Sequence, residues 1–240
     1  MIGPYRNSKL SKKNHVIKMF DQIATRYDFM NHLLSFGIDR KWRRKALEYL
    51  QDSKPMVILD VATGTGDLAI AAYETLHPER IVGIDISESM IEQARQKIKK
   101  HGFERNIIMQ ICDCETINFP NNSFDAIMVA FGIRNFQNLG NGLKEMFRVL
   151  RPNGKVIILE FSNPKKLPIK QLFNFYFKFV TPFIGQLITS NKEAYKYLYH
   201  SVQTFPEGED MIGKINDVGF HSALYKSLTF GICSIYYASK

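Results

Sequence analysis

Five short apolar runs of strand length alternate with segments of helical spacing over most of the chain. The runs are rich in isoleucine and valine and alternate little with polar residues, which is typical of parallel strands covered on both faces. They span residues 55–61, 80–86, 106–112, 124–131 and 155–161. This regular alternation of strand and helix predicts an α/β fold with a doubly wound sheet.

Local signals mark the ends of further elements. Ser87 is a typical helix N-cap and Gly102 a typical C-terminal stop, and apolar residues recur between them at helical spacing. Near the C-terminus, two alternating runs rich in aromatic residues meet around residues 229–231. They predict an antiparallel strand pair that closes one edge of the sheet.

The length of the chain suits a single domain. Its 240 residues, 45% of them apolar, are enough for one sizeable core, so we treat residues 1–240 as one domain. We expect N-terminal helices in 1–54, a ligand-binding core in 55–162, and a C-terminal helix and strand pair in 207–240. Residues 163–206 break the strand–helix rhythm and are rich in aromatic residues, so we expect a helical cap there. Its aromatic side chains either line a site for an apolar ligand or pack into the core, and the sequence leaves both open.

Basic residues gather in two clusters, and the chain carries a net charge of +9. One cluster precedes the first acid, Asp21, and the other is the run RKWRRK at residues 40–45. Such clusters indicate a solvated face or an anionic partner, either nucleic acid or an acidic membrane surface. We find neither the roughly 20 apolar residues that cross a bilayer nor a secretory signal. The three cysteines lack metal-site spacing, so we expect reduced thiols, no metal and a cytoplasmic protein.

A glycine turn follows the first predicted strand in the sequence DVATGTGD, residues 60–67. A dinucleotide-binding turn has a third glycine and leaves the next helix N-terminus free for pyrophosphate. Here Asp67 stands at that helix start, so the turn does not favour a phosphate. The backbone at Gly64, Thr65 and Gly66 would instead lie close to a ligand of another kind.

Acidic residues lie at the ends of three successive predicted strands, where ligands of open parallel sheets bind. Asp60 ends the first strand, Asp85 the second, and Asp113 follows the third. Asp85 lies near the offset of about 20 residues at which an acid holds a ribose diol. The predicted site can thus recognise a ribose but not a phosphate, and its carboxylates favour a cation. S-adenosylmethionine has a ribose, a positive sulfonium group and no phosphate, so it is the predicted ligand. Its predicted site comprises Asp60, Gly64, Thr65, Gly66, Asp85 and Asp113, with the Cys114 amide at the adenine edge.

Several longer motifs occur in the order typical of one enzyme family. The stretches YDFMNHLLSFGIDRKW (residues 27–42) and RVLRPNGKVIILEFS (148–162) resemble its two signatures, each with substitutions. FGIRN (131–135), Pro182 with Gly185, AYKYL (194–198) and the terminal GF…LTFGI also fit. From about Phe20 to its end, the chain therefore resembles the ubiquinone/menaquinone biosynthesis C-methyltransferase family. The resemblance implies a Rossmann-like, seven-stranded S-adenosylmethionine-dependent methyltransferase fold.

The resemblance also implies C-methylation of the ring of a prenylated quinol, and on that basis we expect the menaquinone step from demethylmenaquinol to menaquinol. A quinol ring carbon becomes nucleophilic when a phenolic hydroxyl is deprotonated or strongly polarised. Arg134 follows the fourth predicted strand and is the leading candidate for stabilising that phenolate or orienting a water that takes the proton. A structural ion pair is the other interpretation of Arg134. Asn135 would hold the same oxygen or cap a turn.

Further candidate residues come from the first signature. Tyr27 and Asn31 are expected to line the substrate side. His32 and Asp39 are the next candidates for handling the proton. Asp39 stands where the family signature has histidine, so it either inherits a polar role or is only structural. His32 could equally be an ordinary surface or packed histidine.

Other functions stay open from the sequence. The equivalent benzoquinol step of ubiquinone biosynthesis fits the same resemblance, and a quinone- or lipid-binding carrier is the alternative without turnover. A nucleic-acid methyltransferase would suit the charge, but FGIRN stands where such amino-methylating enzymes usually carry an Asn/Asp-Pro-Pro-aromatic turn, so we expect no nucleic-acid partner. We expect a prenylated quinol substrate and peripheral association with the inner face of an anionic membrane, and leave a homodimer open.

Overall fold

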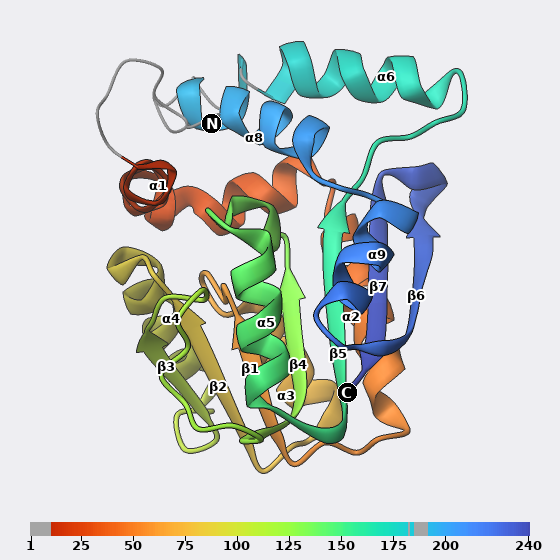
Figure 1. Ribbon diagram of the computed structural model, residues 1–240. Helices are drawn as coiled ribbons and strands as arrows, with labels where there is room; N and C mark the ends of the chain where they lie inside the picture. Colours follow the sequence, from red (N-terminus) through yellow and green to blue (C-terminus); the bar gives the residue numbers. More distant parts are fainter. Residues whose placement is uncertain (1–10, 182, 185–191) are drawn as a thin grey trace.

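A seven-stranded sheet forms the centre of the computed structural model, which describes residues 11–181, 183–184 and 192–240. The strand order is β3-β2-β1-β4-β5-β7-β6, with β1 to β5 parallel and β7 antiparallel to both β5 and β6 (Figure 1). The strands are β1 (Val57–Val61), β2 (Arg80–Asp85), β3 (Ile107–Ile111), β4 (Phe124–Ala130), β5 (Leu150–Phe161), β6 (His221–Leu228) and β7 (Cys233–Ser239). The predicted seven-stranded α/β fold with an antiparallel C-terminal pair is confirmed.

Helices cover both faces of the sheet (Figure 1). One face carries α2 (Ile38–Gln51), α3 (Asp67–Leu76) and α4 (Glu88–His101), and the other carries α5 (Leu139–Val149) and α9 (Glu209–Asp217). Along β4, Ala126 and Met128 belong to the first of these cores, whereas Ile127 and Val129 belong to the second. Because side chains of a strand point alternately to opposite faces, two covered faces require a continuous apolar run.

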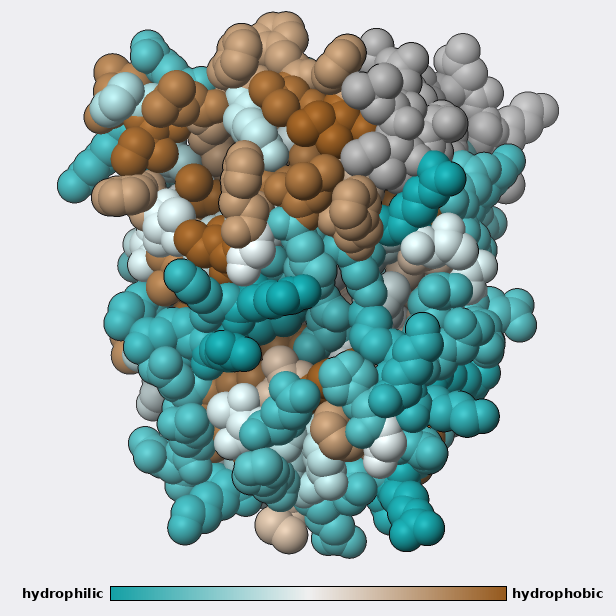
Figure 2. Space-filling model, turned by 180° about the vertical axis from the view of Figure 1, so that it is seen from behind, coloured by the Kyte–Doolittle hydropathy of each residue, from teal (hydrophilic) through white to brown (hydrophobic). Residues whose placement is uncertain are grey.

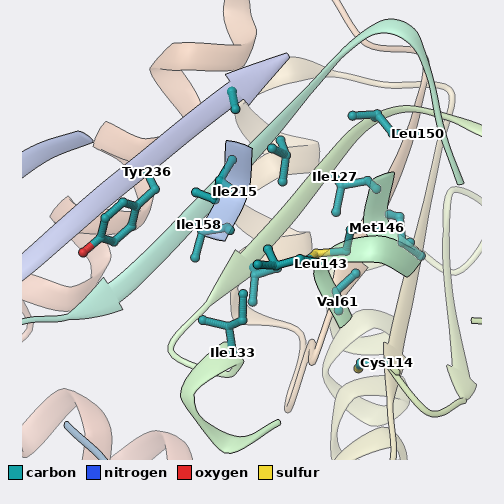
Figure 3. Packing of buried hydrophobic residues seen from close by; sticks show 14 of the residues in the cluster. Val61, Cys114, Ile127, Ile133, Leu143, Met146, Leu150, Ile158, Ile215 and Tyr236 are labelled. Atoms are coloured by element: carbon teal, nitrogen blue, oxygen red, sulfur yellow. The ribbon is translucent and has the colours of Figure 1, made fainter. Parts of the chain in front are cut away.

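The core against α5 and α9 shows this packing at close range. Leu143 and Met146 of α5 and Ile215 of α9 are fully buried against Ile127 and Ile158 of the sheet (Figure 3). Each such side chain contributes roughly 1.5–3 kcal/mol when it leaves water. This core holds the strands rigidly, and therefore also the loops at their carboxyl ends.

Most of the element ends agree with the local signals in the sequence. The Ser87 hydroxyl accepts a hydrogen bond from the amide of Met90 at 3.2 Å, and Gly102 ends α4 in the left-handed conformation with a φ of 72°. The strand pair turns through the short helix η3 (Thr229–Gly231). Strand β5 is longer than predicted and begins at Leu150, with an irregular register against β4 in its first part.

A further layer of helices lies across the carboxyl ends of the parallel strands (Figure 1). It contains α1 (Lys12–Leu34), α6 (Ile169–Phe175), the π-helical segment η2 (Tyr176–Val180) and α8 (Lys192–Thr204). Much of the expected cap at 163–206 is thus helical, although residues 182 and 185–191, with Pro182 and Gly185, lie outside the described residues. The division of the chain into four segments stays a prediction. Within the described ranges, no helix is long and apolar enough to cross a bilayer.

Candidate active site

The residues predicted to bind the cofactor meet in one crevice at the carboxyl ends of β1, β2 and β3. Its lining includes Asp60, Gly64, Thr65, Asp85, Asp113 and Cys114. Gly66 does not line the crevice. Its φ of 83° makes the sharp turn into α3, and a β-carbon there would lie 3.2 Å from Met109 and 3.4 Å from Ala94. The absence of a side chain at Gly66 therefore allows both the turn and the close packing against α4.

Asp85 ties the glycine turn to the start of α4. Its two carboxylate oxygens accept hydrogen bonds from the amides of Gly64 and Ser87, both at 2.9 Å. Burial raises the pKa of Asp85, and these two bonds oppose that shift. The carboxylate thus lines the crevice and also orders the loops around it.

Asp60 presents an unpaired oxygen in the same crevice. It is 1% exposed, one oxygen accepts a hydrogen bond from the Thr63 hydroxyl at 2.5 Å, and the other has no partner. Burial raises the pKa of Asp60 to about 7. A cationic group placed beside the free oxygen would favour the ionised form. The crevice therefore fits a ligand that carries an ammonium or sulfonium group, as S-adenosylmethionine does.

Helix α1 closes the crevice along its length. Lys13 forms an ion pair with Asp113, and Lys12 donates to the Phe136 carbonyl at 2.6 Å. Burial alone would raise the pKa of Asp113, but the bonds from Lys13 and from the Glu115 amide hold it below its usual value. Lys12 and Lys13 were predicted to lie on a solvated face or meet an anionic partner, and in the structure both bond within the fold.

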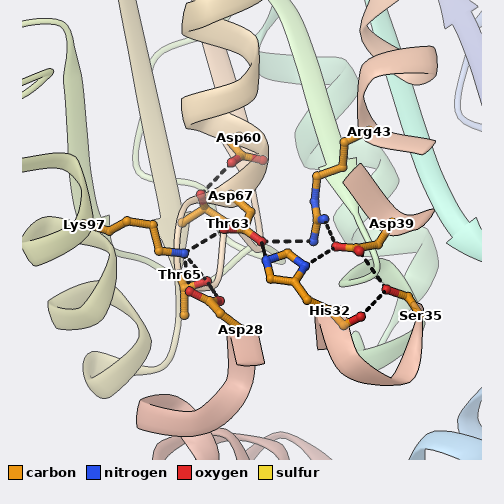
Figure 4. Close-up of polar contacts among 10 residues, drawn as sticks. All are labelled: Asp28, His32, Ser35, Asp39, Arg43, Asp60, Thr63, Thr65, Asp67 and Lys97. Atoms are coloured by element: carbon orange, nitrogen blue, oxygen red, sulfur yellow. Dashed lines mark hydrogen bonds and ion pairs between the residues drawn. The ribbon is translucent and has the colours of Figure 1, made fainter. Parts of the chain in front are cut away.

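A network of ion pairs joins α1 and α2 to the glycine turn and α4 (Figure 4). Arg43 pairs with Asp39 and, at 3.4 Å, with Asp67. His32 lies between the same two carboxylates, with Nδ1 2.9 Å from Asp39 and Nε2 3.6 Å from Asp67. Lys97 approaches Asp67 at 2.7 Å from the other side. The network fixes the two N-terminal helices against the cofactor crevice.

His32 and Asp39 are both held by ion pairs within this network. Burial opposes ionisation of Asp39, but hydrogen bonds from Ser35 and Arg43 outweigh it and lower its pKa to about 2. A carboxylate with that pKa is a weak base near neutral pH. Ligand atoms of His32, Asp39 and Asp67 lie within 4.8 Å of one another, as in a metal site, but Arg43 already bridges the two carboxylates.

Arg43 was missed as a site residue. Within the run RKWRRK it was expected on a solvated or anion-binding face, yet it is only 7% exposed. The signal present in the sequence was its spacing from Asp39, since residues four apart on a helix can pair. The second partner, Asp67, comes from a distant segment, so no local pattern indicates it.

A second, largely apolar cavity of about 610 Å³ adjoins the crevice. Phe20, Tyr27, Arg43, Phe131 and Asn135 line both spaces. Aromatic residues from the cap line it too: Phe173, Tyr176, Phe177 and Tyr197. Phe173 and Phe177 are also buried against each other, with ring centroids 4.3 Å apart. Both interpretations of the cap aromatics, cavity lining and core packing, therefore hold for these rings.

The turn after β4 places the predicted catalytic residues in the cavity wall. Phe131 has a φ of 58°, and a β-carbon on Gly132 would lie 2.5 Å from that of Ala62, so the turn passes very close to the end of β1. The short helix η1 (Ile133–Asn135) follows and carries Arg134 and Asn135. Both of these residues line the apolar cavity.

Arg134 forms a buried ion pair with Glu160 of β5. Nη1 lies 2.6 Å from Oε1, and the two side chains are 6% and 0% exposed. Nη1 also donates to the Phe131 carbonyl. Burial raises the pKa of Glu160, and Arg134 opposes that shift. The ion pair considered for Arg134 is thus present, and the same guanidinium also lines the cavity. Glu160, which the E-x-S part of the second signature contains, was not singled out from the sequence.

Tyr27 and Asn31, predicted to line the substrate side, both lie in α1. Both line the apolar cavity, and Tyr27 also borders the crevice, where its ring lies 4.0 Å from the β-carbon position of Gly64. Burial raises the pKa of Tyr27. Its hydroxyl therefore stays neutral near the junction of the two spaces.

Unpaired polar atoms gather around the two spaces. In the described part of the chain, five buried side-chain polar atoms lack a hydrogen-bond partner: Arg43 Nε, Asp60 Oδ1, Arg134 Nε, Asn135 Oδ1 and the Tyr197 hydroxyl. All five belong to residues that line the crevice, the cavity or both. Buried polar groups are nearly always paired, so such atoms mark places where ligand atoms or water bind.

The strand order, the glycine turn and the acids at the strand ends together define the class of S-adenosylmethionine-dependent methyltransferases. An S-adenosylmethionine-dependent methyltransferase from Thermotoga maritima, described as a possible histamine N-methyltransferase, shares the fold with a TM-score of 0.65 and 16% identity. The match covers 93% of this chain and 99% of that one.

The chain belongs to the ubiE/COQ5 methyltransferase family, whose model matches residues 8–240. The demethylmenaquinone methyltransferase of Bacteroides fragilis is 48% identical over 239 residues, which cover 100% of this chain and 97% of that protein. The ubiquinone/menaquinone biosynthesis C-methyltransferase UbiE of Geobacter sulfurreducens is 45% identical over 234 residues, which cover 97% and 91%. The resemblance seen in the sequence is confirmed, and with it the methyltransferase class and the cofactor.

Proposed function

We propose that this methyltransferase converts demethylmenaquinol to menaquinol by methylating a ring carbon. One observation carries the proposal: a crevice suited to a cationic nucleoside adjoins an apolar, aromatic cavity of about 610 Å³ across a common wall. A cavity of this kind suits a prenylated ring. The relatives from Bacteroides fragilis and Porphyromonas gingivalis, 48% and 40% identical, both bear the name demethylmenaquinone methyltransferase.

The residues of the crevice position the methyl donor. When bound, S-adenosylmethionine supplies a methyl group on a positively charged sulfur. Asp85 takes the ribose hydroxyls and Asp113, once released from Lys13, meets the adenine edge together with the Cys114 amide. The free oxygen of Asp60 receives the cationic end. Because orientation of two reactants supplies much of the rate of such a transfer, the rigid strand ends matter as much as the contacts.

Residues that line the apolar cavity activate the quinol. Arg134 is held by Glu160, stabilises negative charge on the phenolic oxygen next to the accepting carbon and orients a water that takes the phenolic proton. Once the methyl group is bonded to the ring carbon, the proton on that carbon also leaves to water and the ring becomes aromatic again. Asn135 holds the same oxygen, and Tyr27 and Asn31 orient the ring. The buried aromatic walls keep bulk water away from this charge. His32 and Asp39 act as positioning residues, since their network fixes α1 and α2.

The equivalent benzoquinol step is the second candidate, because the relative from Geobacter sulfurreducens is named for both pathways. The quinone pool of the source organism distinguishes them. A strain without this gene should lose its methylated menaquinone almost completely and accumulate demethylmenaquinone, and the intact gene should restore the pool. A demethylated benzoquinone in its place would assign the ubiquinone step. An unchanged pool, or restoration by a variant that binds no cofactor, would contradict an enzymatic role.

We infer that the protein associates peripherally with an anionic membrane through the face around the cavity mouth. Phe36 and Leu172 line the cavity and are also 86% and 65% exposed, so the cavity opens where they lie. Phe175 and Phe179 are exposed as well. Hydrophobic side chains gather in the upper part of the molecule, beside the atoms drawn in grey (Figure 2). Four exposed lysines flank this face: Lys165, Lys166, Lys170 and Lys178. Aromatic side chains beside cations favour an anionic lipid surface, from which the substrate could enter directly.

Vesicle binding tests this surface. The double variant Phe175→Ser/Phe179→Ser should bind phosphatidylglycerol vesicles at least about tenfold more weakly, because two exposed rings can no longer transfer from water into the bilayer. Met56→Ser is the matched control, since Met56 is 53% exposed but precedes β1 at the opposite end of the sheet. If both variants sediment equally with the vesicles, this face does not bind the membrane.

A further inference from the structure

Tyr197 of α8 carries a buried hydroxyl that has no partner. Its side chain is 4% exposed and lines the apolar cavity. The hydroxyl makes no hydrogen bond in the described part of the molecule. Its ring packs in a cluster with Val16, Met19 and Ile23, which a phenylalanine ring would fill equally well. The hydroxyl therefore contributes nothing to the packing of the protein alone.

Two other tyrosines of this fold, the buried Tyr236 and the half-buried Tyr176, use their hydroxyls. The Tyr236 hydroxyl accepts a hydrogen bond from the Gly208 amide at 2.9 Å. Tyr176, which lines the same cavity as Tyr197, donates to the Leu34 carbonyl at 2.9 Å. An unmade buried hydrogen bond is costly, so the free hydroxyl of Tyr197 is an exception that calls for a ligand atom.

The neighbours of Tyr197 have matching unpaired atoms. Helix α8 packs against η1, which carries Arg134 and Asn135. Arg134 Nε is a donor and Asn135 Oδ1 an acceptor, and neither has a partner. Tyr197 also interacts electrostatically with Arg134 and Glu160, and burial raises its pKa to about 12, so it stays neutral. A donor, an acceptor and a hydroxyl that can act as either thus belong to two elements that contact each other and line the same cavity.

We propose that the Tyr197 hydroxyl binds a ring oxygen of the quinol and, beside Arg134 and Asn135, fixes the ring for methylation. This inference rests on the proposed function for the identity of the ligand. A hydroquinone oxygen both donates and accepts, which is what an unpaired donor and an unpaired acceptor require. The hydrogen bond from the Tyr197 hydroxyl to that oxygen becomes stronger as negative charge grows on the oxygen, because hydrogen bonds to charged groups are stronger than those between neutral groups.

Tyr197→Phe removes the hydroxyl and keeps the ring. We expect kcat/KM for the reduced quinol to fall at least about tenfold, S-adenosylmethionine affinity to stay within about twofold, and Tm without ligands to stay equal or rise. Tyr236→Phe is the matched control: it should lower Tm, because the Gly208 amide loses its acceptor, and leave kcat/KM within about twofold. Unchanged kcat/KM in Tyr197→Phe would overturn the inference.

Fluorescence of Trp42 separates this inference from the proposed function. Trp42 is the single tryptophan of the chain and lines the cavity, so its quenching reports ring binding without turnover. Tyr197→Phe should weaken quinol binding at least about tenfold but leave unchanged the binding of a prenylated naphthalene that lacks ring oxygens. If the parent binds quinol in this Tyr197-dependent way and never methylates it, the proposed function fails and the inference stands. If Tyr197→Phe weakens binding of the quinol and of the naphthalene equally, Tyr197 only shapes the cavity and the inference is overturned.

Discussion

Arg134→Lys should lower kcat and kcat/KM for the reduced quinol together, by roughly 10²-fold or more, as does the loss of a preorganised donor to a developing oxyanion. Lysine keeps the charge, but its ammonium cannot bond Glu160 and the Phe131 carbonyl while also facing the cavity. The affinity for S-adenosylmethionine should stay within a few-fold of the parent, because the cofactor contacts lie in the crevice. Steady-state methylation and direct binding measure the two effects separately.

Because Arg134 forms a buried ion pair with Glu160, its substitution can also affect folding, and a control is needed. Arg134→Ala would leave Glu160 buried without its partner, which typically costs about 3–5 kcal/mol. The double variant Arg134→Met/Glu160→Gln avoids the unpaired charge and should fold but remain as inactive as Arg134→Lys. Glu160→Gln alone keeps an acceptor for Nη1 and should lose much less activity. If Arg134→Lys instead keeps kcat and loses only cofactor binding, Arg134 belongs to the cofactor site.

Asp85→Ala should weaken binding of S-adenosylmethionine more than tenfold without unfolding the protein. The ribose loses a charged acceptor, and each such hydrogen bond is worth roughly 1.5–3 kcal/mol. The amides of Gly64 and Ser87 also lose their acceptor, so the glycine turn becomes less ordered. Titration calorimetry measures the affinity, and circular dichroism confirms the fold.

Asp125→Ala is the matched control for Asp85. Asp125 also accepts from two backbone amides, those of Val57 at 2.8 Å and Met56 at 3.1 Å, but at the opposite end of the sheet. Its loss should lower Tm and leave the cofactor affinity unchanged. Equal affinities in folded Asp85→Ala and in the parent would show that the ribose binds elsewhere.

The strands and the gathering of acids at their carboxyl ends could be predicted from the sequence because both follow simple rules. A strand covered on two faces needs an uninterrupted apolar run, and the carboxyl ends of parallel strands meet at one edge. Asp60, Asp85 and Asp113 therefore had to lie near each other once the strands were placed. The N-cap at Ser87 and the stop at Gly102 follow from backbone hydrogen bonding within one turn.

The remaining site residues depend on contacts between distant segments. A basic run looks the same in sequence whether its helix faces water or the core, so the burial of Arg43 against Asp67 could not be anticipated. Tyr197 was one of many aromatics in the cap. Its unpaired hydroxyl becomes visible only when α8 is packed against η1. The same holds for Lys13, whose partner Asp113 lies across the crevice.

Methyl transfer to the reduced and the oxidised form of one short-tailed demethylnaphthoquinone, measured by mass spectrometry under strict exclusion of oxygen, tests the central claim most directly. Only the quinol has a phenolic oxygen whose charge can activate the ring carbon and meet Arg134. We therefore predict a ring-methylated product from the quinol and none above background from the quinone. Equal methylation of the oxidised quinone without reductant would contradict the account.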